Sequence, residues 1–261
     1  MNLIEAILLG IIQGLTEFLP VSSSGHLEIG KSLFGIDPES SLSFSVAVHG
    51  ATVLSTIIVF WKEVFGLSKG FLKFRMNIET HYIFKIIVSL IPVAIVGLFF
   101  KEEVEAFFNG NMVIVGSMLL VTALLLILGS YLKKGNRSIG YLDAFIIGIA
   151  QAFAVLPGIS RSGATISTGL MIGNRREDLA KFSFLMVLIP VIAANLIEIL
   201  SGGLSKADSV PVMVLVAGFI SAFITGYFAC TWMIDIVKKS KLVWFAIYCF
   251  LIGIFAIILG L

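Results

Sequence analysis

The chain has 261 residues, of which 58% are hydrophobic and 13% are charged, and its mean hydropathy is +1.06. Soluble domains carry about 25% charged residues, so this composition excludes an ordinary soluble domain and predicts an integral membrane protein embedded in a lipid bilayer. The formal net charge is +2 and no block of basic residues occurs, so we expect no nucleic-acid partner.

The chain begins with an apolar region, residues 1–34, that a cluster of Pro, Gly and Ser interrupts near its middle. No basic segment precedes the apolar run and Glu5 lies within it, so we expect no cleavable signal peptide. A second broken region covers residues 139–172. Its second arm, residues 162–172, would form about 17 Å of helix, too short to cross roughly 30 Å of hydrocarbon. Each region therefore predicts a re-entrant hairpin whose tip stops inside the membrane.

Uninterrupted apolar runs of roughly 20 residues, enough to cross a bilayer as a helix, follow each broken region. They cover residues 41–62, 80–100 and 111–132 after the first region, and 181–200, 211–234 and 242–261 after the second. The expected fold is an all-α integral membrane protein, a single polytopic domain over residues 1–261. It has six transmembrane helices and two re-entrant helical hairpins.

Lys and Arg are distributed unequally between the connecting loops, and cytoplasmic loops are generally the basic ones. One side of the predicted topology collects Lys62, Lys69, Lys73, Arg75, Lys133, Lys134, Arg137, Arg175, Arg176, Lys181, Lys238, Lys239 and Lys241. The other side keeps Lys31, Lys101 and Lys206. This bias predicts that the first hairpin enters from outside and the second from the cytoplasm.

The two hairpins also share sequence at a spacing of 138 residues, which slips to 137 at the prolines. The matched residues are Gly10 and Gly148, Gln13 and Gln151, Pro20 and Pro157, Ser24 and Ser162, Gly25 and Gly163, and Phe44-Ser45 and Phe182-Ser183. Shared sequence with opposite entry predicts an inverted-topology repeat, with repeat 1 at about 1–132 and repeat 2 at about 139–261. Such repeats bring two broken helices tip to tip near the bilayer midplane.

The first hairpin carries an acidic residue just before its break. Gln13 and Glu17 are four residues apart, so both project from one face of the helix that ends at Pro20. A carboxylate inside a membrane is costly and generally lines a polar cavity. Glu17 is therefore a candidate site residue.

The break itself, PVSSSGH at residues 20–26, begins a new helix with polar residues. Ser22, Ser23, Ser24 and Gly25 provide hydroxyl groups and a flexible backbone at a helix start, where free N–H groups favour anions. His26 follows and can exchange a proton near neutral pH.

The second break, PGISRSGAT at residues 157–165, repeats this pattern but carries a cation, Arg161. An unpaired arginine at the bilayer centre costs about 2.5–3.5 kcal/mol, so a compensating partner is expected. The planar guanidinium binds phosphate oxygens in a bidentate way, so Arg161 between two helix starts predicts a diphosphate cradle. The neighbours expected to line this cradle are Ser160, Ser162, Gly163 and Thr165.

Simpler interpretations of these residues stay open. Small residues in apolar helices also serve close helix packing, and Glu17 could act only as a static counter-ion for Arg161. His49 lies about eight residues into the first span, roughly 12 Å deep, and is open between a packing role and site lining.

The run QGLTEFLPVSSSGH, residues 13–26, and the run PGISRSGAT together closely resemble the undecaprenyl-diphosphate phosphatases, also known as bacitracin-resistance proteins. The resemblance covers essentially the whole chain, and two long motifs in the right order make it highly specific. It implies six spans with two re-entrant hairpins in an inverted repeat, in agreement with the topology above.

The resemblance implies hydrolysis of the terminal phosphate of undecaprenyl (polyprenyl) diphosphate, which recycles the monophosphate carrier lipid for cell-wall glycan (peptidoglycan) synthesis and gives bacitracin resistance. The [Glu or Gln]-x-x-x-Glu motif of the family falls on Gln13 and Glu17, its catalytic serine on Ser23, its histidine on His26 and its diphosphate-binding arginine on Arg161. Members require a divalent cation, Mg²⁺ or Ca²⁺. Gln13 is the uncharged variant, so metal contacts from Glu17 and Gln13 suit a hard cation held mainly by substrate phosphate and water.

We therefore expect a plasma-membrane enzyme whose lipid substrate keeps its tail in the bilayer and inserts its diphosphate into a cavity open to the outer face. Arg161 and the hairpin N–H groups neutralise charge and Glu17 holds the cation. Ser23 attacks phosphorus or positions water, and His26 serves as acid or base. Whether serine, water or histidine is the nucleophile stays open, as does a homodimer.

Two rival functions use the same features. A polyprenyl-phosphate flippase or transporter is the first, because inverted repeats with broken helices are the usual transporter plan. The second is the acid-phosphatase-like lipid phosphatase superfamily, which shares a PSGH string and an SR pair. That group needs a histidine and then an aspartate after the SR pair, and here Ser160-Arg161 is followed by neither within the next seven residues.

Overall fold

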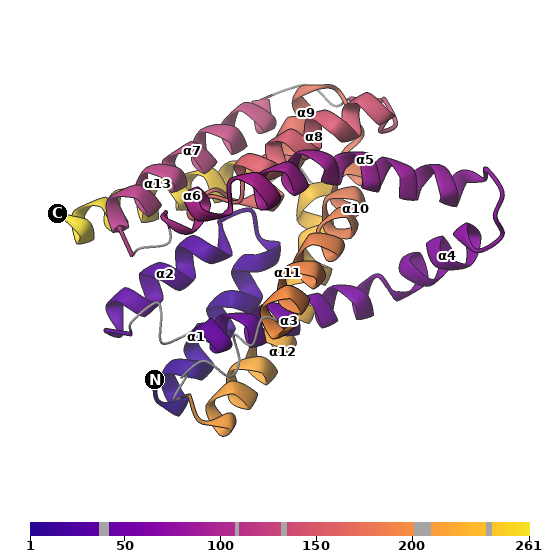
Figure 1. Cartoon of the computed structure of the whole chain (residues 1–261). Helices are drawn as coiled ribbons and strands as arrows, with labels where there is room; N and C mark the ends of the chain where they lie inside the picture. The colour runs from indigo at the N-terminus through magenta and orange to yellow at the C-terminus, as the bar shows by residue number, and fades with distance from the viewer. Residues whose placement is uncertain (37–41, 108–109, 132–134, 201–209, 239–241) are drawn as a thin grey trace.

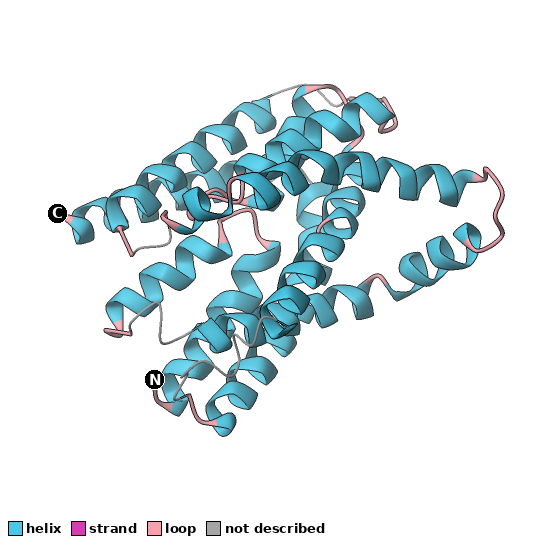
Figure 2. Cartoon of the chain, in the orientation of Figure 1, coloured by secondary structure: helices cyan, strands magenta, loops and turns pink. Residues whose placement is uncertain are grey.

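The computed structural model describes residues 1–36, 42–107, 110–131, 135–200, 210–238 and 242–261. These residues form helices joined by short connections (Figure 1), and no strand occurs among them (Figure 2). In the first half of the chain the helices are α1 (Leu3–Phe18), α2 (Ser23–Leu33), α3 (Leu42–Val59), α4 (Trp61–Phe71), α5 (Ile78–Phe99), α6 (Lys101–Glu105) and α7 (Met112–Tyr131). In the second half they are α8 (Tyr141–Phe153), α9 (Arg161–Met171), α10 (Arg176–Met186), α11 (Leu188–Leu200), α12 (Val212–Lys238) and α13 (Leu242–Gly260).

Six of the described helical segments are long and apolar enough to cross a membrane, which confirms the six predicted spans. The fourth differs in detail, because it begins at Arg176, five residues before the predicted start, and is interrupted at Val187 between α10 and α11. The first turn of this segment is polar, with Glu177 and Asp178, so a prediction based on apolar runs places the start too late. Carboxylates in a first turn stabilise a helix N-terminus, so the helix begins there.

Both broken regions form a helix, a break and a second helix, as predicted. The arms α1 and α2 contact each other, and so do α8 and α9. The second arms, α2 and α9, are 11 residues each. Their re-entrant placement in the membrane, and the inverted topology of the repeats, remain predictions.

The two breaks meet inside the helix bundle. A Cβ atom added to Gly25 would lie 3.0 Å from the Cα atom of Gly158, and one added to Gly163 would lie 3.4 Å from the Cβ atom of Pro20. Helix α7 contacts both second arms and packs along α13. The α7–α13 pair therefore supports the junction of the two breaks.

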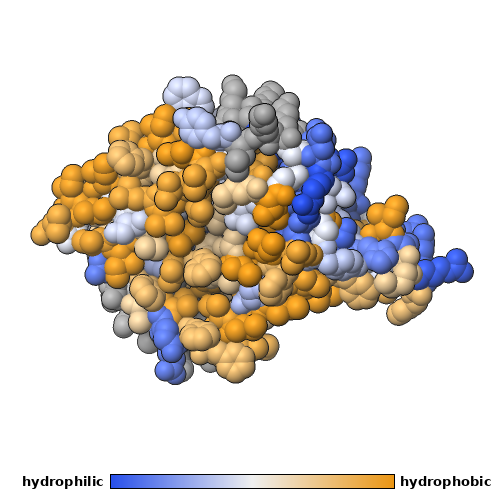
Figure 3. All heavy atoms as spheres, turned by 90° about the horizontal axis from the view of Figure 1, so that it is seen from above, coloured by the Kyte–Doolittle hydropathy of each residue, from blue (hydrophilic) through white to orange (hydrophobic). Residues whose placement is uncertain are grey.

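Apolar side chains cover most of the face seen in Figure 3, and hydrophilic residues gather toward the end that carries the turn between α4 and α5. Exposed basic residues at this end include Lys69 in the last turn of α4 and Lys73 and Arg75 in the turn that follows. Some basic residues used to predict the orientation lie outside the described residues: Lys133, Lys134, Lys206, Lys239 and Lys241.

Candidate active site

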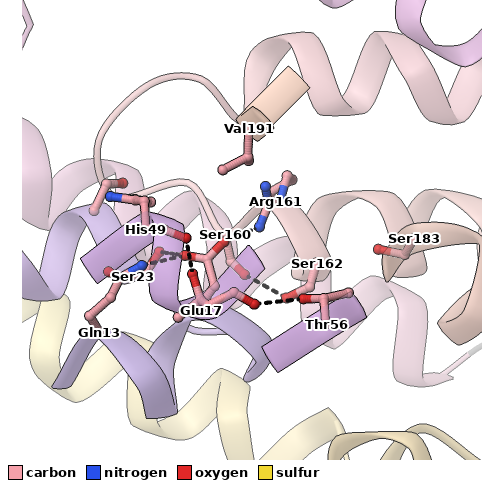
Figure 4. Close-up of polar contacts among 12 residues, drawn as sticks. Gln13, Glu17, Ser23, His49, Thr56, Ser160, Arg161, Ser162, Ser183 and Val191 are labelled. Atoms are coloured by element: carbon pink, nitrogen blue, oxygen red, sulfur yellow. Dashed lines mark hydrogen bonds and ion pairs between the residues drawn. The ribbon is translucent and has the colours of Figure 1, made fainter. Parts of the chain in front are cut away.

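Glu17, in the last turn of α1, is the centre of a polar network between the two breaks (Figure 4). Its Oε1 atom forms an ion pair with Nη2 of Arg161. Its Oε2 atom accepts hydrogen bonds from Oγ of Ser23 at 2.5 Å and from Nε2 of Gln13 at 2.9 Å. The Glu17 side chain is 8% exposed and the Arg161 side chain 23%. A single carboxylate thus joins α1, α2 and α9.

The two breaks have the same local geometry. Ser22 and Ser160 are the N-cap residues of α2 and α9, and each side chain accepts a hydrogen bond from the backbone N–H three residues later, at 3.3 and 3.1 Å. Each N-cap hydroxyl also lies 3.4 Å from the hydroxyl of the serine two residues later. Ser23 and Arg161 are therefore the first residues of their helices, at equivalent positions, and both contact Glu17.

These helix starts suit the binding of an anion. The first N–H groups of a helix have no partner within the helix and carry partial positive charge, so they bind phosphate well. Two such starts and one guanidinium converge on the Glu17 carboxylate. Glu17 is the negative partner of Arg161 in this structure.

A small pocket reaches this network. Its polar lining consists of Glu17, Arg161, Thr52 and Thr56. Apolar side chains of α1, α3, α10 and α11 and of the bend at Val187 form the rest of its wall. The pocket therefore combines the Glu17–Arg161 ion pair with apolar walls, which suit a hydrocarbon chain.

The second break is held from behind by Thr122 of α7. Its hydroxyl donates to the carbonyl oxygen of Gly158 at 2.9 Å and accepts from the backbone N–H of Ser160, also at 2.9 Å. Ser162, in the first turn of α9, donates to the carbonyl oxygen of Leu19 at 3.4 Å. These bonds fix the N-terminus of α9 relative to α1 and α7.

Three predicted site residues lie near the network but bond elsewhere. The ring of His26 bonds the carbonyl oxygen of Ser22 and the hydroxyl of Tyr248. Thr165 bonds the hydroxyl of Ser183 at 2.7 Å, and Figure 4 shows Ser183 apart from the Glu17 cluster. The Nδ1 atom of His49 lies 2.8 Å from the carbonyl oxygen of Ser45, and a role of His49 in lining the site stays a prediction.

The amide oxygen of Gln13, Oε1, is buried and has no hydrogen-bond partner among the described residues. Amide and carboxylate oxygens are the ligands that Mg²⁺ and Ca²⁺ prefer. Within the described part of the chain, no group of three or more His, Cys, Asp or Glu side chains could hold a metal ion. The donor set of Gln13 and Glu17 therefore fits a cation that shares its ligands with a bound phosphate.

Sequence reasoning missed several residues of the site and its surroundings. Thr52 and Thr56 follow His49 at helical spacing on α3, a pattern that could have identified them. Thr122 and Tyr248 lie in apolar helices without a polar neighbour at such spacing from a predicted site residue and give no such signal. Lys31 is buried, which its charge alone did not predict: it is 5% exposed, lies 3.6 Å from a carboxylate oxygen of Glu28 and donates to Ser45 at 3.1 Å. Its placement on the outer side stays a prediction.

Comparison with known proteins shows similarity along nearly the whole chain. A family model described as "Bacitracin resistance protein BacA" matches residues 6–255. A Christiangramia forsetii protein named "Undecaprenyl-diphosphatase" is 56% identical over 260 residues, covering 99% of this chain and 98% of the relative. Proteins of the same name from Bacteroides fragilis and Methanococcus vannielii are 52% and 42% identical, over 100% and 97% of this chain and 99% and 98% of the relatives.

Proposed function

The chain belongs to the bacitracin resistance protein BacA family, and we propose that it is an undecaprenyl-diphosphatase, a membrane hydrolase that removes the terminal phosphate of undecaprenyl diphosphate. The products are undecaprenyl monophosphate and inorganic phosphate. Bacitracin resistance follows from the same activity. The relatives named above carry the phosphatase name over nearly their full length, and the comparisons give no support to a transporter function.

One observation carries the proposal for the site: the contacts of Glu17 with Ser23 and with Arg161 at the meeting point of two helix starts. The cationic side chain and the free N–H groups supply the charge that a diphosphate needs. The pocket beside them supplies apolar walls for the lipid chain. This combination fits a lipid diphosphate better than a free sugar phosphate or nucleotide, which would leave the apolar walls without a partner.

In the reaction, the bond between the terminal phosphorus and the bridging oxygen breaks and undecaprenyl monophosphate leaves, while a new bond forms from phosphorus to an oxygen nucleophile. With water as the nucleophile inorganic phosphate forms directly; with Ser23 a phosphoserine forms, and water hydrolyses it to inorganic phosphate in a second step. Ser23 is placed for this role or for holding the attacking water, because its hydroxyl already donates to Glu17, which can accept the proton. The incoming diphosphate takes the place of the Glu17 carboxylate on Arg161. The guanidinium then stabilises the negative charge that develops on the leaving group, undecaprenyl monophosphate.

We further propose that Glu17 and the unpartnered Gln13 oxygen hold a Mg²⁺ or Ca²⁺ ion together with the substrate. When bound, the cation would neutralise phosphate charge and weaken the hold of Glu17 on Arg161.

The enzyme is a multi-pass membrane protein, and we place it in the plasma membrane with its site reached from the outer face. The excess of Lys and Arg in the loops assigned to the cytoplasm supports this orientation. The first hairpin, which carries Glu17 and Ser23, then enters from outside.

Phosphate release from undecaprenyl diphosphate by the purified protein, with identification of the lipid product, tests the function. Glu17→Gln should abolish release, because it removes both the counter-ion and the proton acceptor. Glu5→Gln makes the same change in the first turn of the same helix, far from the break, and should leave the rate unchanged. Equal rates for the two variants would refute the proposed site.

A further inference from the structure

His26 is held on both sides of its ring by uncharged groups. Its Nδ1 atom lies 2.7 Å from the carbonyl oxygen of Ser22, and its Nε2 atom lies 2.9 Å from the hydroxyl oxygen of Tyr248 on α13. The two rings stack almost in parallel, with centroids 5.5 Å apart and an interplanar angle of 8°. His26 is only 9% exposed. Both ring nitrogens are therefore occupied by groups other than Glu17 and Ser23.

The chemistry of the two partners fixes the tautomer of His26. A carbonyl oxygen can only accept, so Nδ1 carries the hydrogen and donates to Ser22. In the neutral ring Nε2 is then an acceptor, and the Tyr248 hydroxyl is the donor that it meets. A tyrosine hydroxyl at an apolar helix surface needs such a partner. While both bonds hold, the ring has no free nitrogen for nucleophilic attack or for proton exchange with the substrate.

The backbone that His26 holds is strained. Ser22 has φ 69° and ψ 97°, and Ser22 and Phe74 are the residues other than glycine with positive φ in the described part of the chain. Residues other than glycine rarely adopt this backbone conformation, and it persists only where surrounding contacts hold it. The Ser22 carbonyl accepts from both the backbone N–H and the ring of His26.

This strained residue directly precedes Ser23, whose hydroxyl lies 2.5 Å from Glu17. The conformation of Ser22 thus decides where the Ser23 hydroxyl points. Helix α13 also contacts the break at a second place, where the Cys249 thiol lies 3.7 Å from the carbonyl oxygen of Pro20. The first break is therefore supported by α13 in the way that the second is supported by Thr122 of α7.

We propose that Tyr248 is a positioning residue: it locks His26 as the Nδ1–H tautomer, and His26 then fixes the Ser22 backbone so that Ser23 stays against Glu17. His26 is a positioning residue by the same geometry. This inference rests on the proposed function, since positioning has meaning only for a working site. By this inference Tyr248, in the last helix and 222 positions away from His26, takes part in holding the first hairpin in its active geometry.

Two substitutions of His26 separate positioning from proton transfer. In His26→Asn the side-chain amide nitrogen takes the place of Nδ1 and can still donate to Ser22, whereas in His26→Gln it lies farther out, near the place of Nε2. Neither amide can act as an acid or base near neutral pH or attack phosphorus. We expect His26→Asn to keep activity within roughly tenfold of wild type, the factor expected for a changed neutral hydrogen bond, and His26→Gln to lose far more. Equal loss in both variants would overturn the proposal.

Tyr248→Phe keeps the stacked ring and removes only the hydroxyl. We expect kcat to fall by roughly three- to tenfold, the effect of one neutral hydrogen bond, while KM is unchanged. A pure change in KM, or no change, would contradict the positioning role. Tyr227→Phe makes the same change at an exposed position of α12 and serves as the control.

Nitrogen NMR of protein labelled at histidine gives a readout that needs no activity. The chain has three histidines, and the His26 signal is identified by its loss in His26→Asn. We expect wild-type His26 to be protonated on Nδ1 alone, and Tyr248→Phe to populate both tautomers. A wild-type ring protonated on Nε2, or on both nitrogens at neutral pH, would overturn the inference. If the tautomer is as expected but wild type releases no phosphate, the proposed function fails instead.

Discussion

Glu17 of α1 and Arg161 of α9, 144 residues apart in the sequence, form an ion pair at the point where the two breaks of the chain meet. The pair is largely shielded from its surroundings, and the same carboxylate also accepts from Ser23 and Gln13. A buried ion pair gives little net stability, but loss of one partner leaves an unpaired charge at high cost. The pair therefore joins the two hairpins and keeps a guanidinium ready for an anion.

Neutralising one member of this pair should destabilise the protein more than neutralising both. Glu17→Gln or Arg161→Gln alone should lower the free energy of unfolding by about 3 kcal/mol, because each leaves an uncompensated charge. The double variant should recover much of this loss and remain inactive. Denaturant unfolding in detergent micelles measures the difference. Strictly additive losses in the double variant would show that the pair is not coupled.

Gly158 should tolerate alanine poorly, for two reasons. Its φ is 99°, and an added Cβ would overlap the carbonyl oxygen of Val115 on α7. Gly173 has a similar φ of 89°, but nothing lies within 4 Å of its added Cβ. Gly173→Ala should therefore show the backbone strain alone, about 1 kcal/mol, and Gly158→Ala a larger loss. The thermal unfolding midpoints of the two variants, measured in the same detergent, compare these losses. Equal shifts from wild type would mean that the close approach of Gly158 to α7 is unimportant.

Thr122→Val should weaken the support of the second break. Valine has the same shape but leaves the carbonyl of Gly158 and the N–H of Ser160 without a partner. Each unsatisfied buried group costs about 1–3 kcal/mol, so stability and kcat should both fall. Thr122→Ser keeps the hydroxyl and should behave close to wild type. The expectation is wrong if valine and serine give the same unfolding free energy.

Gln13→Glu should change the cation requirement of the enzyme. A second carboxylate one helical turn from Glu17 repels it, and a divalent cation between them relieves that repulsion. The Mg²⁺ or Ca²⁺ concentration at half-maximal phosphate release should fall several-fold. Gln13→Leu, which removes the unpartnered oxygen, should raise it. If both variants keep the wild-type concentration, Gln13 does not contact the cation.

Local sequence was enough to predict the parts of the fold that depend on composition. The six spans, the two breaks and the short second arms follow from apolar runs and from Pro, Gly and Ser clusters. The ion pair of Glu17 with Arg161 was only an alternative to their predicted roles, cation holding for Glu17 and diphosphate binding for Arg161, although neither charge could be left alone in a membrane. The shared sequence of the two hairpins predicted that their breaks are alike, and the matched N-cap geometry of Ser22 and Ser160 agrees with it.

The missed features depend on contacts between distant segments. Tyr248 reaches His26 across 222 residues, and no periodicity in α13 distinguishes it from an ordinary interfacial aromatic residue. The strain at Ser22 is visible only in the backbone. Lys31 was counted by its charge alone, and its burial beside Glu28 and Ser45 depends on how α2 approaches the start of α3.

The central claim is that the Arg161 side chain binds and stabilises a diphosphate in the site formed by the two breaks. Its most direct test is the initial rate of phosphate release from undecaprenyl diphosphate by Arg161→Lys, compared with wild type and with Arg75→Lys in the exposed turn after α4. Lysine keeps the charge but loses the planar fork, so we expect Arg161→Lys to fall by about a hundredfold, the loss typical of one transition-state donor, while Arg75→Lys is unchanged. Wild-type rates for both variants would show that the planar guanidinium of Arg161 is not needed to bind or stabilise the diphosphate.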